Sequence, residues 1–193
     1  MKNKTVRFLR AAAAMLLAAM LMMTMSGCLN AYTGKPSADA APATPEDEQA
    51  ARDVIIRYLD AFCAKDAQAM ADTMCSPVRL AQLQQANGAT EEDFLKLMQE
   101  NLKNMDLQYG ADSYLEYDPE SIKSENADEY IDLLNDEFRV DRESGLIVDM
   151  ARVVSATVWM NTTESEDKVD VADGSMLVYR YDGQWYIYGS AQQ

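Results

Sequence analysis

Residues 178–187 of this 193-residue chain read VYRYDGQWYI, and this stretch decides the fold. Aromatic and β-branched residues dominate on both sides of Asp182-Gly183, a dipeptide that favours the two-residue turn of a β-hairpin. The stretch therefore predicts two antiparallel strands that meet at this turn. We expect the first strand to cover residues 169–181 with a bulge at Asp173-Gly174, and the second to cover residues 184–188.

A further alternating stretch precedes the hairpin. From Val153 to Met160, every second side chain is apolar, which predicts a strand with one buried face. Residues 162–167 are polar and predict the turn that joins this strand to the hairpin. The C-terminal part of the chain is therefore expected to be an antiparallel meander.

The N-terminal half has a helical period instead. Apolar residues recur at intervals of three and four between residues 51 and 64, and the same period predicts a short helix over residues 67–74. Lys65-Asp66 is the turn between these helices, and Ser76-Pro77 is expected to end the second one.

Two more helices are indicated by N-cap residues. Thr90 can cap a helix that carries Phe94, and Asn126 can cap one over residues 131–138. Residues 106–119 are ambiguous and fit a loop or a strand. Helices first and strands last predict an α+β fold, with N-terminal helices packed on a C-terminal curved antiparallel sheet.

The first 27 residues predict a targeting segment. Four cations precede an uncharged run over residues 11–25, which ends at Ser26-Gly27-Cys28. This ending resembles the bacterial lipoprotein signal, in which the cysteine sulfur carries diacylglycerol and the chain is cut before it. An uncleaved membrane span is the less favoured alternative, because the run is shorter than the roughly 20 residues that cross a bilayer. We expect a lipid on Cys28 to hold the protein on the extracytoplasmic face of the cell membrane.

This signal sets the expected domain boundaries and the charge of the exported chain. Residues 1–27 form the signal peptide, residues 28–45 the lipidated cysteine and a flexible tether, and residues 46–193 the folded domain. Cleavage removes four of the 17 Lys+Arg and none of the 32 Asp+Glu, so the formal charge changes from −15 to −19. A surface of this charge repels phosphate backbones, which excludes nucleic acid as a partner.

Two segments carry a resemblance to a known superfamily. Residues 57–66, RYLDAFCAKD, and the closing stretch VYRYDGQWYI resemble the nuclear transport factor 2-like superfamily. The resemblance covers about residues 46–190 and implies a cystatin-like α+β roll, in which a curved sheet wraps around a long helix. Members include ketosteroid isomerase, SnoaL-like cyclases and many bacterial lipoproteins. A pocket in the cone of this roll would be lined by Tyr58, Phe62, Trp159, Tyr179 and Trp185.

The catalytic set of the isomerase branch is not matched. Tyr58 stands at the place of its tyrosine donor, but Leu177 takes the place of its neutral acid, and residues 75–78 lack its general-base aspartate. The chain also has no histidine, which excludes Ser-His-Asp and Cys-His triads. Since proton transfer needs a positioned base, we expect no enzymatic activity and no cofactor. The acidic runs lack the spacing of a calcium loop, so no metal is expected either.

Three hypotheses of function follow. The leading one is a non-enzymatic binding or interaction domain that meets an envelope or extracellular partner through its sheet or its acidic face. The alternatives are a small-molecule carrier or degenerate enzyme that uses the cone pocket, and a structural module that forms a homodimer through the sheet. Cys63 and Cys75 are expected to be two buried thiols, because a helical hairpin would stagger them beyond disulfide reach. A disulfide between them is the alternative in an exported protein.

Overall fold

The computed structural model describes residues 35–162 and 169–190. The predicted signal peptide, Cys28 and the first part of the predicted tether lie outside these residues, as does nearly all of the predicted turn at residues 162–167. Within the described ranges, no helix is both long and apolar enough to cross a membrane.

Four helices precede the sheet: α2 (Pro45–Cys63), α3 (Ala67–Met74), α4 (Pro77–Asn87) and α5 (Glu91–Tyr109). Helices α2, α3 and α5 confirm the three helices predicted in this part of the chain, and Thr90 caps α5 in a capping box with Asp93. Helix α4 was not predicted. Ser76 and Pro77, which were expected to end α3, begin α4 instead: the Ser76 hydroxyl accepts from the Arg79 N–H, and Pro77 takes the first helical position.

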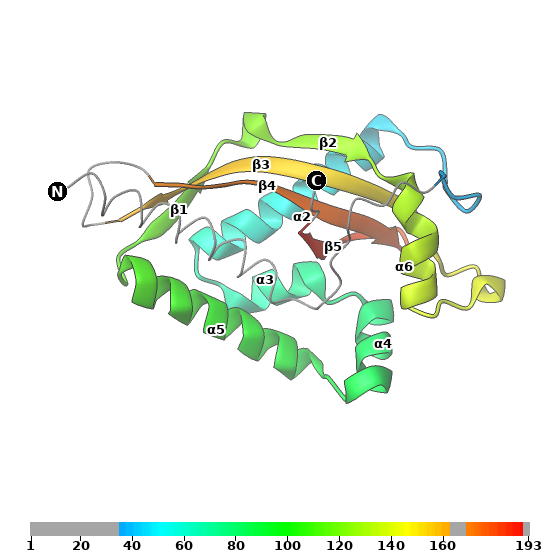
Figure 1. The fold of residues 1–193 in the computed structure, drawn as a ribbon, viewed down its shortest axis with the longest axis horizontal. Coiled ribbons are helices and arrows are strands. Elements are labelled where there is room, and N and C mark those ends of the chain that lie inside the picture. Colours follow the sequence, from blue (N-terminus) through cyan, green and yellow to red (C-terminus); the bar gives the residue numbers. More distant parts are fainter. Residues whose placement is uncertain (1–34, 163–168, 191–193) are drawn as a thin grey trace.

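The sheet has five antiparallel strands: β1 (Tyr114–Tyr117), β2 (Lys123–Asn126), β3 (Val148–Asn161), β4 (Val169–Tyr181) and β5 (Gln184–Ser190). Its order is β1-β3-β4-β5, and β2 pairs with the same edge of β3 as β1 does. Asp182 and Gly183 have φ angles of 51° and 72°, as the predicted hairpin turn requires. The fold is α+β, with N-terminal helices packed on a curled antiparallel sheet (Figure 1).

Two local predictions were wrong. Asn126 does not cap a helix but ends β2, and its side-chain oxygen accepts from the Asp128 N–H in a turn that leads to the short helix α6 (Ile131–Glu137). The predicted bulge at Asp173-Gly174 is absent, because the pairing of these residues with Thr157 and Ala156 is continuous. The register shifts instead near Trp159 in β3 and between Leu177 and Val178 in β4.

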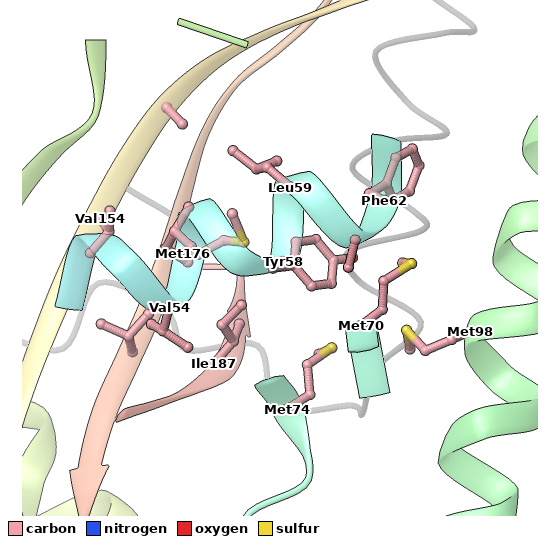
Figure 2. Close-up of a cluster of buried hydrophobic side chains, with 14 of the residues drawn as sticks. Val54, Tyr58, Leu59, Phe62, Met70, Met74, Met98, Val154, Met176 and Ile187 are labelled. Carbon is pink, nitrogen blue, oxygen red and sulfur yellow. The ribbon is translucent and has the colours of Figure 1, made fainter. Parts of the chain in front are cut away.

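Each face of the sheet has its own hydrophobic core. The inner face packs against α2, α3 and α5, and Figure 2 shows part of this inner core around Val54 and Tyr58. The inner core contains all seven methionines that follow residue 27: Met70, Met74, Met98, Met105, Met150, Met160 and Met176. The outer face packs against α6, and this outer core includes Leu134, Phe138, Leu177, Tyr179 and Tyr188.

Residues 35–44, which we call the strap, are packed on the domain. The Ser37 hydroxyl donates to Asp132 of α6 across 2.7 Å, and the Ala41 N–H donates to the Asp149 carbonyl across 2.9 Å. The predicted flexible tether, residues 28–45, is therefore not free over its last part. The strap holds the chain entering α2 at the end of the sheet that carries α6 (Figure 1).

Candidate functional site

The five residues predicted to line a cone pocket are divided by the sheet. Tyr58, Phe62 and Trp185 belong to the inner core, whereas Tyr179 belongs to the outer core. Trp159 is half-buried and lies between Val158 and Met160, which both face the inner core, so its own side chain is on the outer face. The structure therefore brings three of the five residues together.

The space around Tyr58 is filled by side chains. Tyr58 is 8% exposed, its ring lies 6.4 Å from that of Phe62, and it points toward Met70 and Met98 (Figure 2). Burial raises the pKa of the Tyr58 phenol to about 12, so the phenol is neutral at physiological pH. This tyrosine is part of a packed core.

A surface groove of about 500 Å³ lies between α4 and the end of α6. One wall consists of Ala81, Gln82, Gln84 and Gln85, which share a side of α4 because residues three and four apart are neighbours on a helix. Phe138 and Arg139, directly after α6, form the other wall. Arg139 adopts a left-handed φ of 53°, and its Nη1 donates to Gln85 Oε1 across 3.2 Å. We call this feature the α4–α6 groove.

The α4 wall of the groove carries no negative charge. Helix α4 reads PVRLAQLQQAN, with no acid among its residues, although the chain has 32 Asp+Glu. Its single charged residue, Arg79, is buried. Each glutamine amide offers two donors and a carbonyl acceptor. The wall is therefore neutral and rich in hydrogen-bonding groups.

The buried side chain of Arg79 attaches α4 to strand β5 of the sheet. Its side chain is 1% exposed, and its Nη1 donates to the carbonyls of Ile187 (3.0 Å) and Met74 (3.4 Å). The guanidinium carbon lies 5.2 Å from the ring centre of Tyr188 and 5.7 Å from that of Phe94. Among the described residues no carboxylate pairs with Arg79, and these contacts compensate part of the cost of burying its charge.

Two hydroxyl contacts complete the support of the groove. The Ser76 and Tyr179 hydroxyls lie 2.6 Å apart, and the Tyr188 hydroxyl donates to Glu137 across 2.7 Å. Burial raises the pKa of both phenols, and Glu137 raises that of Tyr188 further. The Phe138 ring packs 5.1 Å from that of Tyr179. These contacts attach α4 and the end of α6, the two walls of the groove, to the sheet.

The Ser76 hydroxyl at this corner hydrogen-bonds to no general base among the described residues. The Ser76 hydroxyl contacts a phenol and the Arg79 N–H, neither of which can take its proton. Elsewhere Cys63 and Cys75 are separate thiols, as predicted, but both are half-buried rather than buried, and this partial burial raises the pKa of both. Such thiols are poor nucleophiles at neutral pH. In residues 35–162 and 169–190, no cluster of three acidic or cysteine side chains is arranged to hold a metal ion.

Sequence reasoning missed the groove because it missed α4. Ser76-Pro77 fits both the end of one helix and the N-cap and first residue of the next. The absence of acids from residues 77–87 was a visible signal of a distinct surface. Nothing local to either segment indicates that Gln85 and Arg139 meet.

No protein-family model matches the chain, and no curated protein sequence matches it.

Proposed function

We propose that this protein is a bacterial lipoprotein, anchored through a lipid on Cys28, whose extracytoplasmic domain is a non-enzymatic binding module of the nuclear transport factor 2-like type. The sequence of residues 1–28 supports the anchor. The helices packed inside a curled antiparallel sheet are consistent with the proposed superfamily. The α4–α6 groove is the proposed binding surface.

The neutral α4 wall is the observation that carries this proposal. Interface centres in proteins are depleted of charged residues, whereas this chain as a whole is strongly acidic. Gln82, Gln84 and Gln85 lie together on this wall and can satisfy the polar groups of a partner. Because Arg79 and Ser76 hold α4 on the sheet, the wall is preformed and binding does not have to order it.

Photo-crosslinking in the producing bacterium tests the proposal. Full-length protein with p-benzoylphenylalanine at Gln84, inside the groove, should form a discrete crosslinked species. The same amino acid at Lys103, exposed on α5, is the matched control and should form none. Adding Ala81→Trp, which fills the groove, should abolish the Gln84 species. If the species persists in that variant, the groove is not the binding surface.

A further inference from the structure

We propose that Arg52, Ser124 and Arg152 form a binding site for the carboxylate group of a small organic acid, at the edge of the sheet where β2 pairs with β3. We call these three residues the edge cluster. None of them lines the α4–α6 groove, so this inference goes beyond the proposed function and does not depend on it. Two observations carry it: the polar groups that the fold leaves unpaired, and the strand and helix positions that bring them together.

The edge cluster contains buried polar groups without a hydrogen-bond partner. Among residues 35–162 and 169–190, nothing pairs with Arg52 Nε or with the Ser124 hydroxyl, although both atoms are buried. Arg152 is 5% exposed, and its side chain makes no hydrogen bond within the same ranges. Its Nη2 lies 3.9 Å from Glu48 Oε1, which is too long for a hydrogen bond. Because buried polar groups in folded proteins are almost always hydrogen-bonded, three such side chains in one place indicate a ligand.

The register of the sheet places Ser124 beside Arg152. Ser124 pairs directly with Val154, a residue of the inner core, so the Ser124 side chain also lies on the inner face. Asn126 pairs with Arg152, two residues before Val154. Ser124 and Arg152 are therefore diagonal neighbours on one face, about 7–8 Å apart, a separation that a long side chain spans.

Two contacts show how α2 lies along the sheet. Glu48, near the start of the helix, lies 3.9 Å from Arg152 of β3. Asp60, twelve residues later, accepts across 2.6 Å from the hydroxyl of Tyr117 on β1, and Tyr117 pairs with Val158 of β3. Twelve residues of a helix and six residues of a strand both cover about 18–20 Å, so α2 runs along β3 in the same direction.

The same alignment places Arg52 beside Ser124. Arg52 follows Glu48 by four residues and therefore lies one turn further along the same face of α2. That rise, about 6 Å, matches two residues of β3. Arg52 is therefore level with Val154, the residue that pairs with Ser124. The edge cluster thus joins two guanidinium groups and a hydroxyl from three elements, α2, β2 and β3.

The chemistry of the edge cluster selects a small acid with a single negative charge. A guanidinium presents N–H donors in a fork that matches the two oxygens of a carboxylate, and a serine hydroxyl donates to the same kind of acceptor. Among the described residues, Glu48 is the only carboxylate that pairs with either guanidinium, so one positive charge is left to balance. A dianion would add an excess negative charge to a chain that is already strongly acidic. Because Arg152 is almost completely buried, only a small acid can reach it.

Arginine side-chain NMR tests the site on the full mature chain. Sodium acetate replaces sodium chloride stepwise at pH 7 and constant ionic strength, and the Nε–H signals of Arg52 and Arg152 are assigned by their loss in Arg52→Lys and Arg152→Lys. We expect both signals to shift together and to reach half-saturation at about 10 mM acetate or below. The signal of Arg57, exposed on the same helix, should not move. Unchanged Arg52 and Arg152 signals would show that water alone satisfies these donors, and would overturn the proposal.

Sulfate tests the ligand class. It offers the same kind of acceptor oxygens as acetate but carries two negative charges at pH 7. We expect sulfate, titrated at the same ionic strength, to bind at least about tenfold more weakly than acetate, because its second charge is not balanced. Sulfate binding as tight as that of acetate overturns the assignment of a singly charged carboxylate.

Variants assign the binding to the edge cluster, with the Arg152 signal as the readout. Arg52→Gln should weaken acetate binding by about tenfold or more, since it removes a charge and a donor, and Ser124→Ala by about threefold. Arg57→Gln is the matched control, because it removes the same charge from an exposed position of α2, and it should leave the affinity unchanged. Arg52 and Ser124 are only half-buried, so circular dichroism should show an unchanged fold for both variants. An acetate affinity of Arg52→Gln and Ser124→Ala equal to that of the parent overturns the proposal.

Discussion

The Arg79 guanidinium on α4 donates to the main-chain carbonyl of Ile187 on edge strand β5 across 3.0 Å. Tyr181 and Gln184 flank the two-residue turn as the closing pair of the β4–β5 hairpin. From this closing pair on, hydrogen-bonded and non-hydrogen-bonded positions alternate along β5. Ile187 is at a non-hydrogen-bonded position, so its N–H and C=O point away from β4. The Arg79 side chain thus occupies the Ile187 carbonyl, an acceptor at the sheet edge with which a further strand could otherwise pair. The same hydrogen bond attaches α4 to the sheet.

Replacing Arg79 should destabilise the protein substantially. Arg79→Ala removes the bonds to Ile187 and Met74 and both ring contacts, and it leaves a cavity, so we expect the free energy of unfolding to fall by about 3 kcal/mol. Arg79→Met retains most of the apolar stem and should cost less. Urea denaturation measures both effects, with Lys103→Ala as the exposed control. A loss below about 0.5 kcal/mol for Arg79→Ala would show that this contact does not hold α4.

A partly buried arginine, Arg180, makes the stability of the domain depend on pH. Arg180 on β4 donates to Asp47 at the start of α2 (2.6 Å) and to Asp149 on β3 (2.8 and 2.9 Å). Partial burial works against ionisation of Asp47, but hydrogen bonds from Thr44 and the charge of Arg180 outweigh it, so the pKa of this carboxyl is lowered. A carboxyl whose pKa is lowered on folding stabilises the fold at pH values above about 4, the ordinary pKa of aspartate. This stabilisation is lost as the pH falls through the lower pKa of the folded state.

Asp47→Asn should remove that dependence. The variant keeps the shape of the side chain but cannot ionise, so its unfolding free energy should change less between pH 6 and pH 3 than that of the parent. Glu46→Gln, at the neighbouring exposed first-turn position, is the matched control and should keep the steeper dependence. Chemical denaturation at the two pH values measures the slopes. Equal slopes for the parent and Asp47→Asn would show that Asp47 does not link pH to folding.

The predicted elements are those whose signals are local. Residues 51–64 and 67–74 show their helical period within a few turns, and Thr90 marks the start of α5 because its capping box spans only four residues. The alternation of β3 and the Asp182-Gly183 turn likewise lie within short segments. Strand β2, which reads KSEN, has no strand signal of its own and exists because it pairs with residues 152–155 of β3.

The candidate site depends on contacts between distant segments. Gln85 and Arg139, whose side chains meet across the groove, are 54 residues apart in the sequence. Ser76 and Tyr179, whose hydroxyls meet between α4 and the sheet, are 103 residues apart. No periodicity or capping signal reports such contacts. The aromatic residues of the sheet were predicted as one pocket because sequence alternation shows that faces differ but not which strands share a face. The sheet register separates Tyr179 from Trp185, and only the structure supplies it.

The hairpin turn provides a test of backbone conformation alone. Gly183 has a φ of 72°, and a Cβ added there meets no atom within 4 Å. Gly183→Ala should therefore cost only the left-handed backbone penalty of about 1–2 kcal/mol. Gly145→Ala, at a φ of 74° with equally open surroundings, should cost about the same and serves as the matched comparison. A Gly183→Ala cost far above that of Gly145→Ala would mean that the hairpin rearranges.

The strap makes the free length of the tether depend on a few polar contacts. Ser37 bonds to Asp132, and Asp39 pairs with Arg142 across 2.5 Å. The double variant Ser37→Ala/Arg142→Gln should release residues 35–43, so that the first packed residue is Thr44, 16 positions after Cys28, instead of Ser37, nine positions after it, and the maximum reach from Cys28 increases to about 55 Å. Release should speed hydrogen exchange of the Ala41 amide, now bonded to Asp149, by about tenfold or more. The amide of Ile55, inside α2, should exchange as in the parent. Unchanged protection of Ala41 would show that the apolar contacts of Ala40 and Ala41 hold the strap without these two bonds.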